Sequence, residues 1–266
     1  MQKNNLKCAP GKEFSNDSCM SLNVLIGMAE AHNKECYENN TTDKLIDMHH
    51  SYAVYNASKY KKYLVAKFSK LYSDECDDQQ CLIKQPFVKR MNKAQQEELT
   101  EFTFRPEGPT GRFDWLSTTN INDVMKQYEN THTNFKFLGA VPIDFDDIKE
   151  LGISKLDLSD LLKNNINKLG IVFNLDESWK SGSHWVASYA DLENGYIYFF
   201  DSYGVPPEKR IRKLMRRIAK FMQKELKIKP VADYNRVRHQ FEGSECGVYS
   251  INFILRMLDG EPFDDI

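Results

Sequence analysis

The sequence predicts an α+β fold with a mainly helical N-terminal region. Three observations support this fold class. Residues 1–110 are rich in lysine, asparagine and tyrosine and show mostly helical patterns. Three short apolar runs between residues 170 and 201 are typical of strands. A basic amphipathic helical pattern and an apolar helical pattern follow these runs before the chain ends.

The composition is that of an ordinary globular protein. Of 266 residues, 41% are hydrophobic and 28% are charged, which argues against disorder, collagen and coiled coil. The 36 Lys and Arg residues nearly balance the 38 Asp and Glu residues, which excludes a wholly basic nucleic-acid binder but not a local basic patch. No apolar run reaches the roughly 18 residues that span a bilayer. The start, MQKNNLKCAPGKEF, lacks the apolar run of a secretory signal.

Cysteine is sparse for a chain of this length, with six residues in all. Because the chain has the features of a cytosolic protein, we expect reduced thiols and no pairing of Cys8 with Cys19. A zinc site built from these two residues, Cys76, Cys81 and the histidines at 49 and 50 is not favoured, because the spacing is not the usual C-x2-C. The sequence therefore predicts neither disulfides nor a bound metal.

Apolar residues at helical spacing predict three helices in the N-terminal region: Met20–Lys34, Thr42–Leu71 with breaks, and Lys89–Glu101. Ser21 and Thr42 are the expected N-caps. The segment RPEGPTG, Arg105–Gly111, has two Pro and two Gly and is the strongest breaker in the chain. We therefore expect a mainly helical region over residues 1–110 and a second domain over residues 111–266.

The second domain begins with helical patterns. In LSTTNINDVMKQYENTH, residues 116–132, capping residues precede apolar side chains at helical spacing. Asp157–Leu169 is expected to form another helix. The run GIVFNL, Gly170–Leu175, is continuously apolar, as in a strand that is buried on both faces.

A hairpin and two further helices complete the predicted elements. The strands His184–Tyr189 and Tyr196–Asp201 flank an Asn-Gly turn, which is a good hairpin signal. Lys209–Lys229 reads as a basic amphipathic helix and Val231–Val237 as a strand. Gly247–Leu258 reads as a buried helix that glycine and proline stop signals close.

Cys246 is the first candidate catalytic residue. It directly precedes an apolar helical segment, so its sulfur would lie at a helix N-terminus, where the macrodipole favours the thiolate. A thiolate is the nucleophilic form of cysteine, and the backbone N–H at the same place would face a developing oxyanion. The alternative is an inert cysteine in the core, and this segment alone leaves both readings open.

His184 and Asp201 lie on the two strands of the predicted hairpin. A two-residue turn at Asn194 and Gly195 would hold them about 13 Å apart. A four-residue loop over residues 191–194 would place them opposite each other on one face, within reach of a histidine–carboxylate hydrogen bond. The sequence does not choose between these loops, and Asp201 could equally be a turn residue that bonds its own backbone.

Gln240 lies six residues before Cys246, where its amide could supply a second oxyanion donor, although a lone Gln is usually an ordinary surface residue. The ordered set His184-Trp185, Asp201-Ser, Gln240, Cys246-Gly resembles the cysteine peptidases of the adenovirus-protease and SUMO-protease clan. The resemblance covers roughly residues 115–266. The N-terminal arm and the segment TGRFDWLSTTNINDVMKQYE add a similarity to maturation proteases of large cytoplasmic DNA viruses.

The resemblance implies a papain-like cysteine peptidase fold of that type, with a twisted, largely antiparallel sheet that carries His184 and Asp201. It implies Cys246 as nucleophile, His184 as general base, Asp201 as its orienter and Gln240 as oxyanion donor, while Trp185 helps wall the substrate cleft. The implied reaction is peptide hydrolysis through a thioester, with no cofactor. The implied substrates are viral structural polyproteins cleaved after small residues such as Gly-Gly, in the host cytoplasm or the virion.

Three alternatives stay open. An isopeptidase that removes a ubiquitin-like modifier would use the same residues, certain clan relatives transfer acetyl groups, and a non-catalytic binding module could keep the fold. Lys209–Lys229 has ten basic residues and one Glu. We expect the basic side of this helix to be mainly a solvated face. The alternative hypothesis is weak, sequence-independent contact with nucleic acid. No membrane partner is expected.

Overall fold

The computed structural model describes residues 8–49, 55–109 and 115–266. The contacts between Cα atoms divide the chain between Glu107 and Gly108 into two compact units. The predicted boundary segment, Arg105–Gly111, lies partly outside the described residues. Residues 110–114, which belong to the segment used for the viral resemblance, and His50 of the disfavoured zinc site lie wholly outside them.

The first unit is helical, as predicted, but its helices begin where side-chain caps are found. Helix α1, Leu22–Glu38, starts as expected, because the Ser21 side chain accepts a hydrogen bond from the backbone N–H of Val24. Of the broken helix predicted over Thr42–Leu71, only the last part forms, and its predicted start at Thr42 is wrong. Residues 42–44 form one 3-10 turn with no side-chain cap. Helix α3, Ala57–Leu71, begins after Asn56, whose side chain accepts from the Lys59 N–H.

The helix predicted over Lys89–Glu101 is broken into short pieces. A 3-10 turn, Pro86–Arg90, comes first. Helix α4, Lys93–Glu97, then starts after the cap Asn92 and runs into a π-helical turn, Glu98–Phe102. These pieces pack with α1 and α3 around a core of their own, which includes Phe68 and Phe87.

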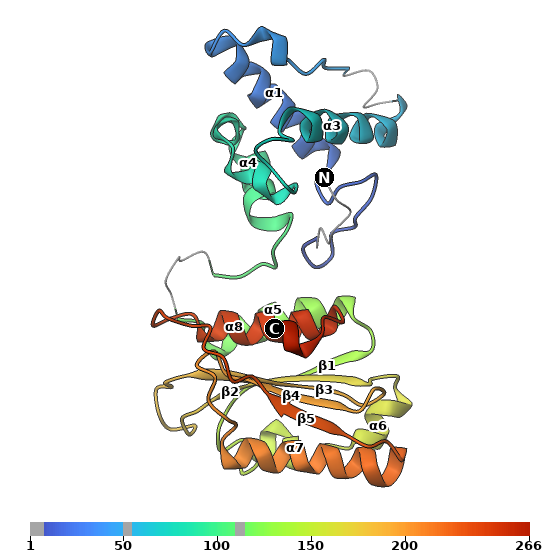
Figure 1. Ribbon diagram of the computed structural model, residues 1–266, viewed down its shortest axis with the longest axis vertical. Coiled ribbons are helices and arrows are strands. Elements are labelled where there is room, and N and C mark those ends of the chain that lie inside the picture. The colour runs from blue at the N-terminus through green and yellow to red at the C-terminus, as the bar shows by residue number, and fades with distance from the viewer. Residues whose placement is uncertain (1–7, 50–54, 110–114) are drawn as a thin grey trace. The chain divides into compact units, whose positions relative to one another are not determined.

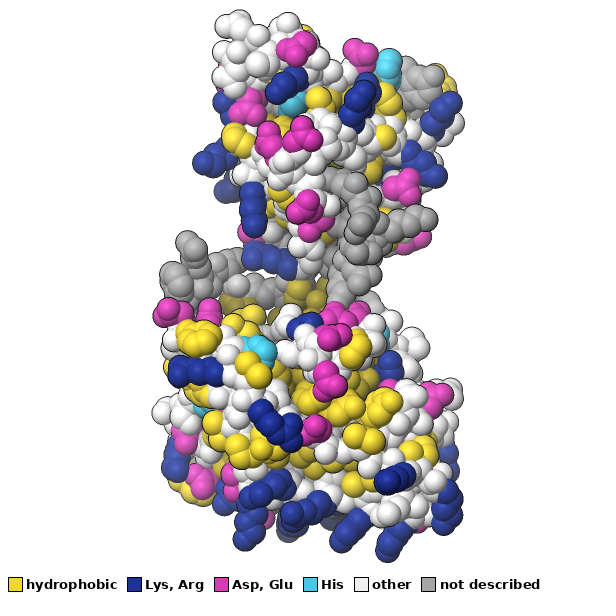
Figure 2. All heavy atoms as spheres, viewed as in Figure 1, with side chains coloured by type: hydrophobic (Ala, Val, Ile, Leu, Met, Phe, Trp, Pro, Cys, Tyr) yellow, Lys and Arg dark blue, Asp and Glu magenta, His cyan; other side chains and the backbone are white. Residues whose placement is uncertain are grey.

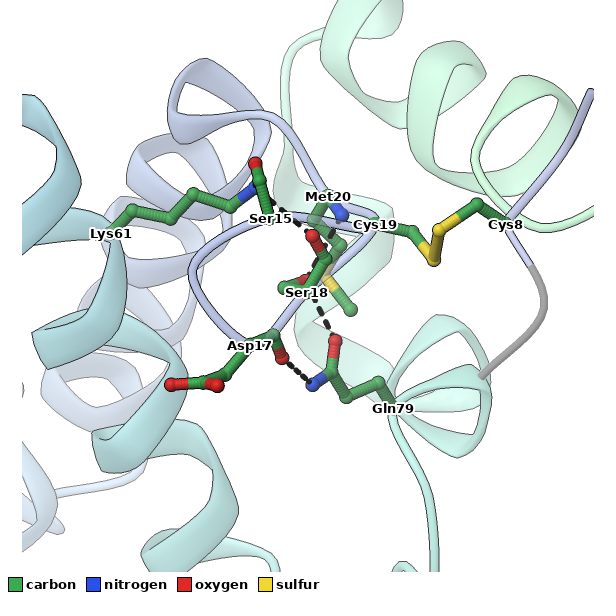
Figure 3. Close-up of a disulfide and its surroundings, with 8 residues drawn as sticks. All are labelled: Cys8, Ser15, Asp17, Ser18, Cys19, Met20, Lys61 and Gln79. Atoms are coloured by element: carbon green, nitrogen blue, oxygen red, sulfur yellow. Dashed lines mark hydrogen bonds between the residues drawn. A yellow bond between two sulfur atoms is a disulfide. The ribbon is translucent and has the colours of Figure 1, made fainter. Parts of the chain in front are cut away.

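Two disulfides contradict the expectation of reduced thiols. Cys8 is bonded to Cys19, and Cys76 to Cys81, with Cα atoms 5.3 and 5.4 Å apart. Cysteine spacing alone could not reveal this, because loop folding sets the distance between the paired thiols. The two disulfide loops also contact each other, as Figure 3 shows. Gln79 accepts a hydrogen bond from the Ser18 hydroxyl at 2.7 Å and donates one to the Asp17 carbonyl at 2.7 Å.

The second unit is built on one five-stranded sheet. Its strands are β1 (Phe135–Pro142), β2 (Lys168–Asn174), β3 (Trp185–Asp191), β4 (Tyr196–Phe200) and β5 (Val231–Tyr234). They are hydrogen-bonded in sequence order. The pairs β2–β3 and β3–β4 are antiparallel, whereas β1–β2 and β4–β5 are parallel. The prediction of a largely antiparallel sheet is therefore wrong, because helical crossovers at both edges return the chain in the same direction.

Helices cover both faces of this sheet (Figure 1). Helices α5 (Thr118–Thr131) and α8 (Cys246–Leu258) lie on one face, where α8 packs on β3 and α5 on β1. Helix α7 (Lys209–Phe221) lies on the other face and packs on β4. It is amphipathic, as predicted, but ends at Phe221 instead of Lys229. Its buried residues are Ile211, Leu214, Met215 and Ile218. The short α6 (Leu158–Lys163) ends earlier than predicted because Lys168 already starts β2.

The strand alternation explains these two layers. Along β3, Ala187 and Tyr189 join the core under α8, while Val186 and Ala190 join the core over α7. Both faces of β3 are therefore buried, and its two ends are where side chains can serve a site. Within the described part of the chain, no helix is long and apolar enough to cross a membrane.

Candidate active site

Cys246 is the first residue of α8. No side chain caps this helix, whose N-cap residue is Glu245, so the first-turn N–H groups are not occupied by a capping oxygen. Cys246 is 1% exposed, and a hydrogen bond from the backbone N–H of Trp185 reaches its sulfur. The apolar residues that follow bury one face of α8 against the sheet and so fix the position of the sulfur.

His184 and Asp201 flank the hairpin at the end where its pairing stops. His184 immediately precedes β3, and its backbone carbonyl accepts from the Leu175 N–H at 2.9 Å. Asp201 immediately follows β4. The observed register pairs Ala187 with Phe200 and Asp191 with Tyr196. Neither predicted register is correct. The loop has four residues, but they are 192–195, so Asp201 lies diagonally across from His184 on the same face.

The two side chains nevertheless meet. His184 Nε2 and Asp201 Oδ1 are 2.7 Å apart, and both residues are buried. The same Oδ1 accepts a hydrogen bond from the Tyr203 N–H at 2.9 Å. The Tyr203 ring stacks on the imidazole with centroids 4.6 Å apart. Because Nε2 faces the carboxylate, Nδ1 is the ring nitrogen that remains for the hydrogen bond between His184 and Cys246.

The electrostatics favour charge separation between the ring and the thiol. Burial lowers the pKa of His184. Hydrogen bonds to Asp201 and Cys246, and the negative charges of both, outweigh burial and raise this pKa to about 9. Burial raises the pKa of Cys246, but hydrogen bonds from His184 and from backbone N–H groups outweigh that effect. The pKa of the thiol therefore lies below its ordinary value. The arrangement can hold a thiolate beside an imidazolium at neutral pH.

Gln240 lies fully buried, with 0% exposure, in the loop before α8. Its Oε1 accepts from the Ser202 hydroxyl at 2.7 Å, and its Nε2 donates to the Glu242 carbonyl at 2.6 Å. The Ser202 carbonyl accepts from the N–H groups of His239 and Gln240, at 2.8 and 3.0 Å. The turn after Asp201 thus holds the Gln240 loop, and the second amide hydrogen of Gln240 has no acceptor among these contacts.

Trp185 lies beside the thiol and is hydrogen-bonded to the segment before α5. Its indole Nε1 donates to the Leu116 carbonyl at 2.9 Å. A Cβ placed on Gly247 would come 3.0 Å from the Leu116 Cβ, so only glycine lets Leu116 lie this close to α8. Trp115 and Trp185 line a hollow of about 580 Å³. His184 and Cys246 do not line it, so the hollow lies beside the chemistry rather than around it.

Three residues that position Asp201 and Gln240 were given no role from the sequence: Ser202, Tyr203 and Asn235. Asn235 clamps the backbone of Asp201, accepting from its N–H at 2.8 Å and donating to its carbonyl at 2.7 Å. Ser202 and Tyr203 directly follow Asp201 in the sequence, which is a signal that could have found them. Asn235 is 34 residues away, and only the β4–β5 pairing brings it near.

Among the described residues, no group of three or more His, Cys, Asp or Glu side chains could hold a metal ion. The chemical groups at hand are therefore a thiol, an imidazole, a carboxylate, a carboxamide and the free N-terminus of a helix.

Known proteins share these features. The family model described as the Ulp1 protease family, C-terminal catalytic domain, matches residues 165–266. A protein of Acanthamoeba polyphaga mimivirus named as a thiol protease is 36% identical over 97% of this chain and 86% of its own length. A cysteine protease of African swine fever virus is 27% identical over 78% of this chain and 82% of its own.

The fold comparison agrees with the sequence comparison. The crystal structure of the African swine fever virus protease matches with a TM-score of 0.53 and 25% identity, over 77% of this chain and 82% of that one. The predicted α+β fold of the SUMO-protease type is confirmed. The chain belongs to the Ulp1 protease family and is a cysteine-type peptidase.

Proposed function

We propose that Cys246 is the nucleophile of a cysteine endopeptidase, His184 its general base and Asp201 the residue that orients His184. One observation carries the proposal. The thiol at the start of α8 is hydrogen-bonded to an imidazole whose other nitrogen lies 2.7 Å from a buried carboxylate. This is the arrangement of an activated nucleophile with an oriented base.

The reaction follows from these contacts. The Cys246 sulfur attacks the carbonyl carbon of the scissile peptide, and the carbonyl electrons move to oxygen. His184 donates its proton to the departing amine as the C–N bond breaks, which leaves a thioester. Water then attacks the thioester, His184 accepts a proton from it, and the C–S bond breaks to release the acid and restore the thiolate.

The oxyanion of both tetrahedral intermediates is assigned to two donors, the backbone N–H of Cys246 and the side chain of Gln240. The helix N-terminus adds its partial positive charge. Gln240 can serve because Ser202 and Glu242 hold its amide while one N–H stays uncommitted. Such a donor contributes on the order of 3 kcal/mol to transition-state stabilisation. Trp185 is proposed to wall the substrate cleft, since it lines the hollow beside the site.

The proposed substrates are viral structural polyproteins, cleaved after small residues such as Gly-Gly. Similarity to proteases of two viruses supports this choice and supports action in the host cytoplasm or the virion. Residues 111–266 are proposed as the catalytic domain, because every residue of the site lies in the unit that begins at Gly108. Residues 1–110 are proposed as the appended, mainly helical region.

Cleavage of a peptide library by wild-type and Cys246→Ala protein tests this function. We expect the wild type to select small residues before the cleaved bond and the variant to give no turnover with an unchanged fold. Cleavage by the variant would refute the nucleophile. Preference for ubiquitin-like modifier fusions would favour an isopeptidase, and acetyl-CoA turnover would favour a transferase. If Cys246 fails to react with iodoacetamide at neutral pH, a non-catalytic module is favoured.

A second proposal concerns α7, which we infer makes weak contact with nucleic acid. Basic side chains line its outer face along the lower edge of Figure 2. Asp146 pairs with Lys213 and Arg217, and Glu177 with Arg210, whereas Arg212 and Arg216 are exposed. The test is the fluorescence anisotropy of a labelled DNA duplex. Binding should weaken steeply between about 50 and 200 mM salt. It should also weaken in R212A/R216A but not in the control K149A/K155A; equal binding by both variants refutes the contact.

A further inference from the structure

A second hollow lies at the end of the sheet opposite to the Cys246 site. It has a volume of about 680 Å³ and opens between the last residues of β3, the strands β4 and β5, and the segment after α8. Tyr189 and Asp191 of β3 line it. Because Trp185 and Asp191 are the two ends of β3, the hollow lies about 20 Å along the strand from the catalytic groups. Nothing in the proposed peptidase mechanism uses it.

The hollow has an aromatic floor. The rings of Tyr198 and Phe263 stack in parallel with centroids 4.2 Å apart, and Tyr196 continues the stack at 5.5 Å from Tyr198. Tyr196 and Val231 are exposed at its rim. On the face shown in Figure 2, hydrophobic side chains gather over β4, β5 and the C-terminal segment, with acidic side chains beside them. An exposed apolar patch with a polar edge is typical of a surface that binds a partner.

One buried polar atom in this hollow has no partner. Tyr189 is 1% exposed, and among the described residues its hydroxyl is the one buried side-chain N or O atom that lacks a hydrogen bond. Neighbouring Asp191 does not bond to it. The Asp191 carboxylate accepts instead from the N–H groups of Glu193 and Asn194 and from the Asn194 side chain. Burial, then the charge of Asp191, raises the pKa of Tyr189, so the hydroxyl stays neutral and can accept a hydrogen bond.

The lining of the hollow carries more negative than positive charge. Four carboxylate residues line it, Asp191, Asp233, Glu261 and Asp264, together with the ammonium group of Lys168. Arg236 pairs with Asp233 at 2.8 Å and Arg256 pairs with Glu261 at 2.6 Å, so the excess negative charge comes from Asp191 and Asp264. Burial raises the pKa of Tyr198, and the charges of Tyr196, Asp264 and Asp233 raise it further, which reports the same field at the aromatic floor. A cation placed over these rings would gain from both the field and the ring faces.

We propose that this hollow binds a lysine or arginine side chain presented by a protein partner. The aromatic floor would contact the alkyl stem and the charged head, and the Tyr189 hydroxyl would accept a hydrogen bond from the ammonium or guanidinium group. The exposed apolar rim of Tyr196 and Val231 fits the backbone beside the inserted residue, which favours a protein over a free amine. A metal ion fits poorly, because among the described residues no group of three or more His, Cys, Asp or Glu side chains could hold one.

NMR titration of the full chain tests this site with four probes: Ac-Ala-Lys-Ala-NH2, Ac-Ala-Arg-Ala-NH2, the neutral Ac-Ala-Gln-Ala-NH2, and putrescine. We expect saturable shifts of amides around Tyr189 and Tyr198 with a basic peptide and none with the Gln peptide. Tyr189→Phe keeps the ring and removes only the hydroxyl, and it should weaken the basic peptide about tenfold. Asp264→Asn should also weaken it, whereas the control Asp147→Asn, on an exposed turn outside the hollow, should not.

Each other outcome overturns the proposal. Absence of saturable shifts with both basic peptides removes the site. Binding of putrescine without either peptide makes it a small-cation site and refutes the protein partner. Peptide binding that Tyr189→Phe leaves unchanged shows that the hydroxyl plays no part. The rate of Cys246 alkylation by iodoacetamide should be equal in all variants, so failure here is distinguishable from failure of the proposed peptidase site.

Discussion

Replacement of Asp201 by asparagine should remove a charge from the site while keeping its hydrogen bonds. The reason is that one oxygen, Oδ1, serves both His184 Nε2 and the Tyr203 N–H. An asparagine whose Oδ1 stays in that place accepts both bonds. The Tyr203 N–H also prevents an amide flip, because a flip would bring an NH2 group against this donor. Asp201→Ala, in contrast, leaves both donors without an acceptor in a buried place.

The size of the effect follows from the pKa of His184. The rise from 6.5 to about 9 favours the imidazolium by roughly 3 kcal/mol, at about 1.4 kcal/mol for each pKa unit. Asp201 and the Cys246 thiolate share this gain. Loss of the Asp201 charge should therefore lower kcat/KM at neutral pH by roughly ten- to a hundredfold. Loss of the base in His184→Ala should cost more, on the order of a thousandfold or above.

The pH dependence gives a sharper readout than the rate. The pKa of His184 in the folded protein lies above its ordinary 6.5. The imidazolium is therefore kept at neutral pH and loses its proton, and with it the ion pair, as pH rises through about 9. The pKa of Cys246 in the folded protein is lowered. The ion pair is therefore also lost when pH falls below the pKa of the thiol, because the thiolate is then protonated. In Asp201→Asn both limbs should move inward, and the bell-shaped pH profile of kcat/KM should narrow, because turnover needs both the Cys246 thiolate and the protonated His184. An unchanged profile, or an activity loss equal to that of His184→Ala, would refute the orienting role.

Three further outcomes follow from the contacts around the site and in the first unit. Ser202→Ala should lower kcat about tenfold through a misplaced Gln240, with the alkylation rate of Cys246 unchanged; an equal fall in alkylation would contradict this. Gly247→Ala should displace Leu116, whose Cβ would lie 3.0 Å away, and raise KM more than it lowers kcat in a peptide assay. Reduction of the two disulfides by dithiothreitol should lower the unfolding free energy of the first unit, measured by calorimetry. The expected loss is about 3 kcal/mol for Cys8–Cys19, with a separation of 11 residues, and about 2 kcal/mol for Cys76–Cys81, with a separation of 5. No change would mean that other contacts hold the loops.

Local chemistry explains which elements could be predicted. Ser21 and Ser117 are N-caps that begin α1 and α5, and both helices follow their predicted starts. The stripe of α7 and the apolar run of α8 also need no distant partner to be recognised. Thr42 failed as a cap because the chain extends again at Leu45, where ψ is 141°. A capping residue indicates a helix only when the following residues continue it.

Features that depend on distant partners could not be predicted. Of the two hairpin loops that the sequence left open, the four-residue loop has the observed length but is shifted by one residue, because Asp191 closes the loop with its own carboxylate and Gly195 takes the positive φ of 78°. That shift moves the register by two and preserves the face, which is why His184 and Asp201 still meet. The disulfides and the Asn235 clamp depend on loops whose approach the sequence alone does not encode in any local pattern.

The burial of Cys246 changes which residues matter most for its reactivity. At 1% exposure, desolvation acts against both charges of the pair, since it raises the thiol pKa and lowers the imidazole pKa. An exposed pair could form a thiolate with little help, whereas this one depends on the third charge, that of Asp201. Asp201 is in turn held through both its N–H and its carbonyl by Asn235. The β4–β5 pairing that brings Asn235 to Asp201 is thus a structural requirement for the thiolate.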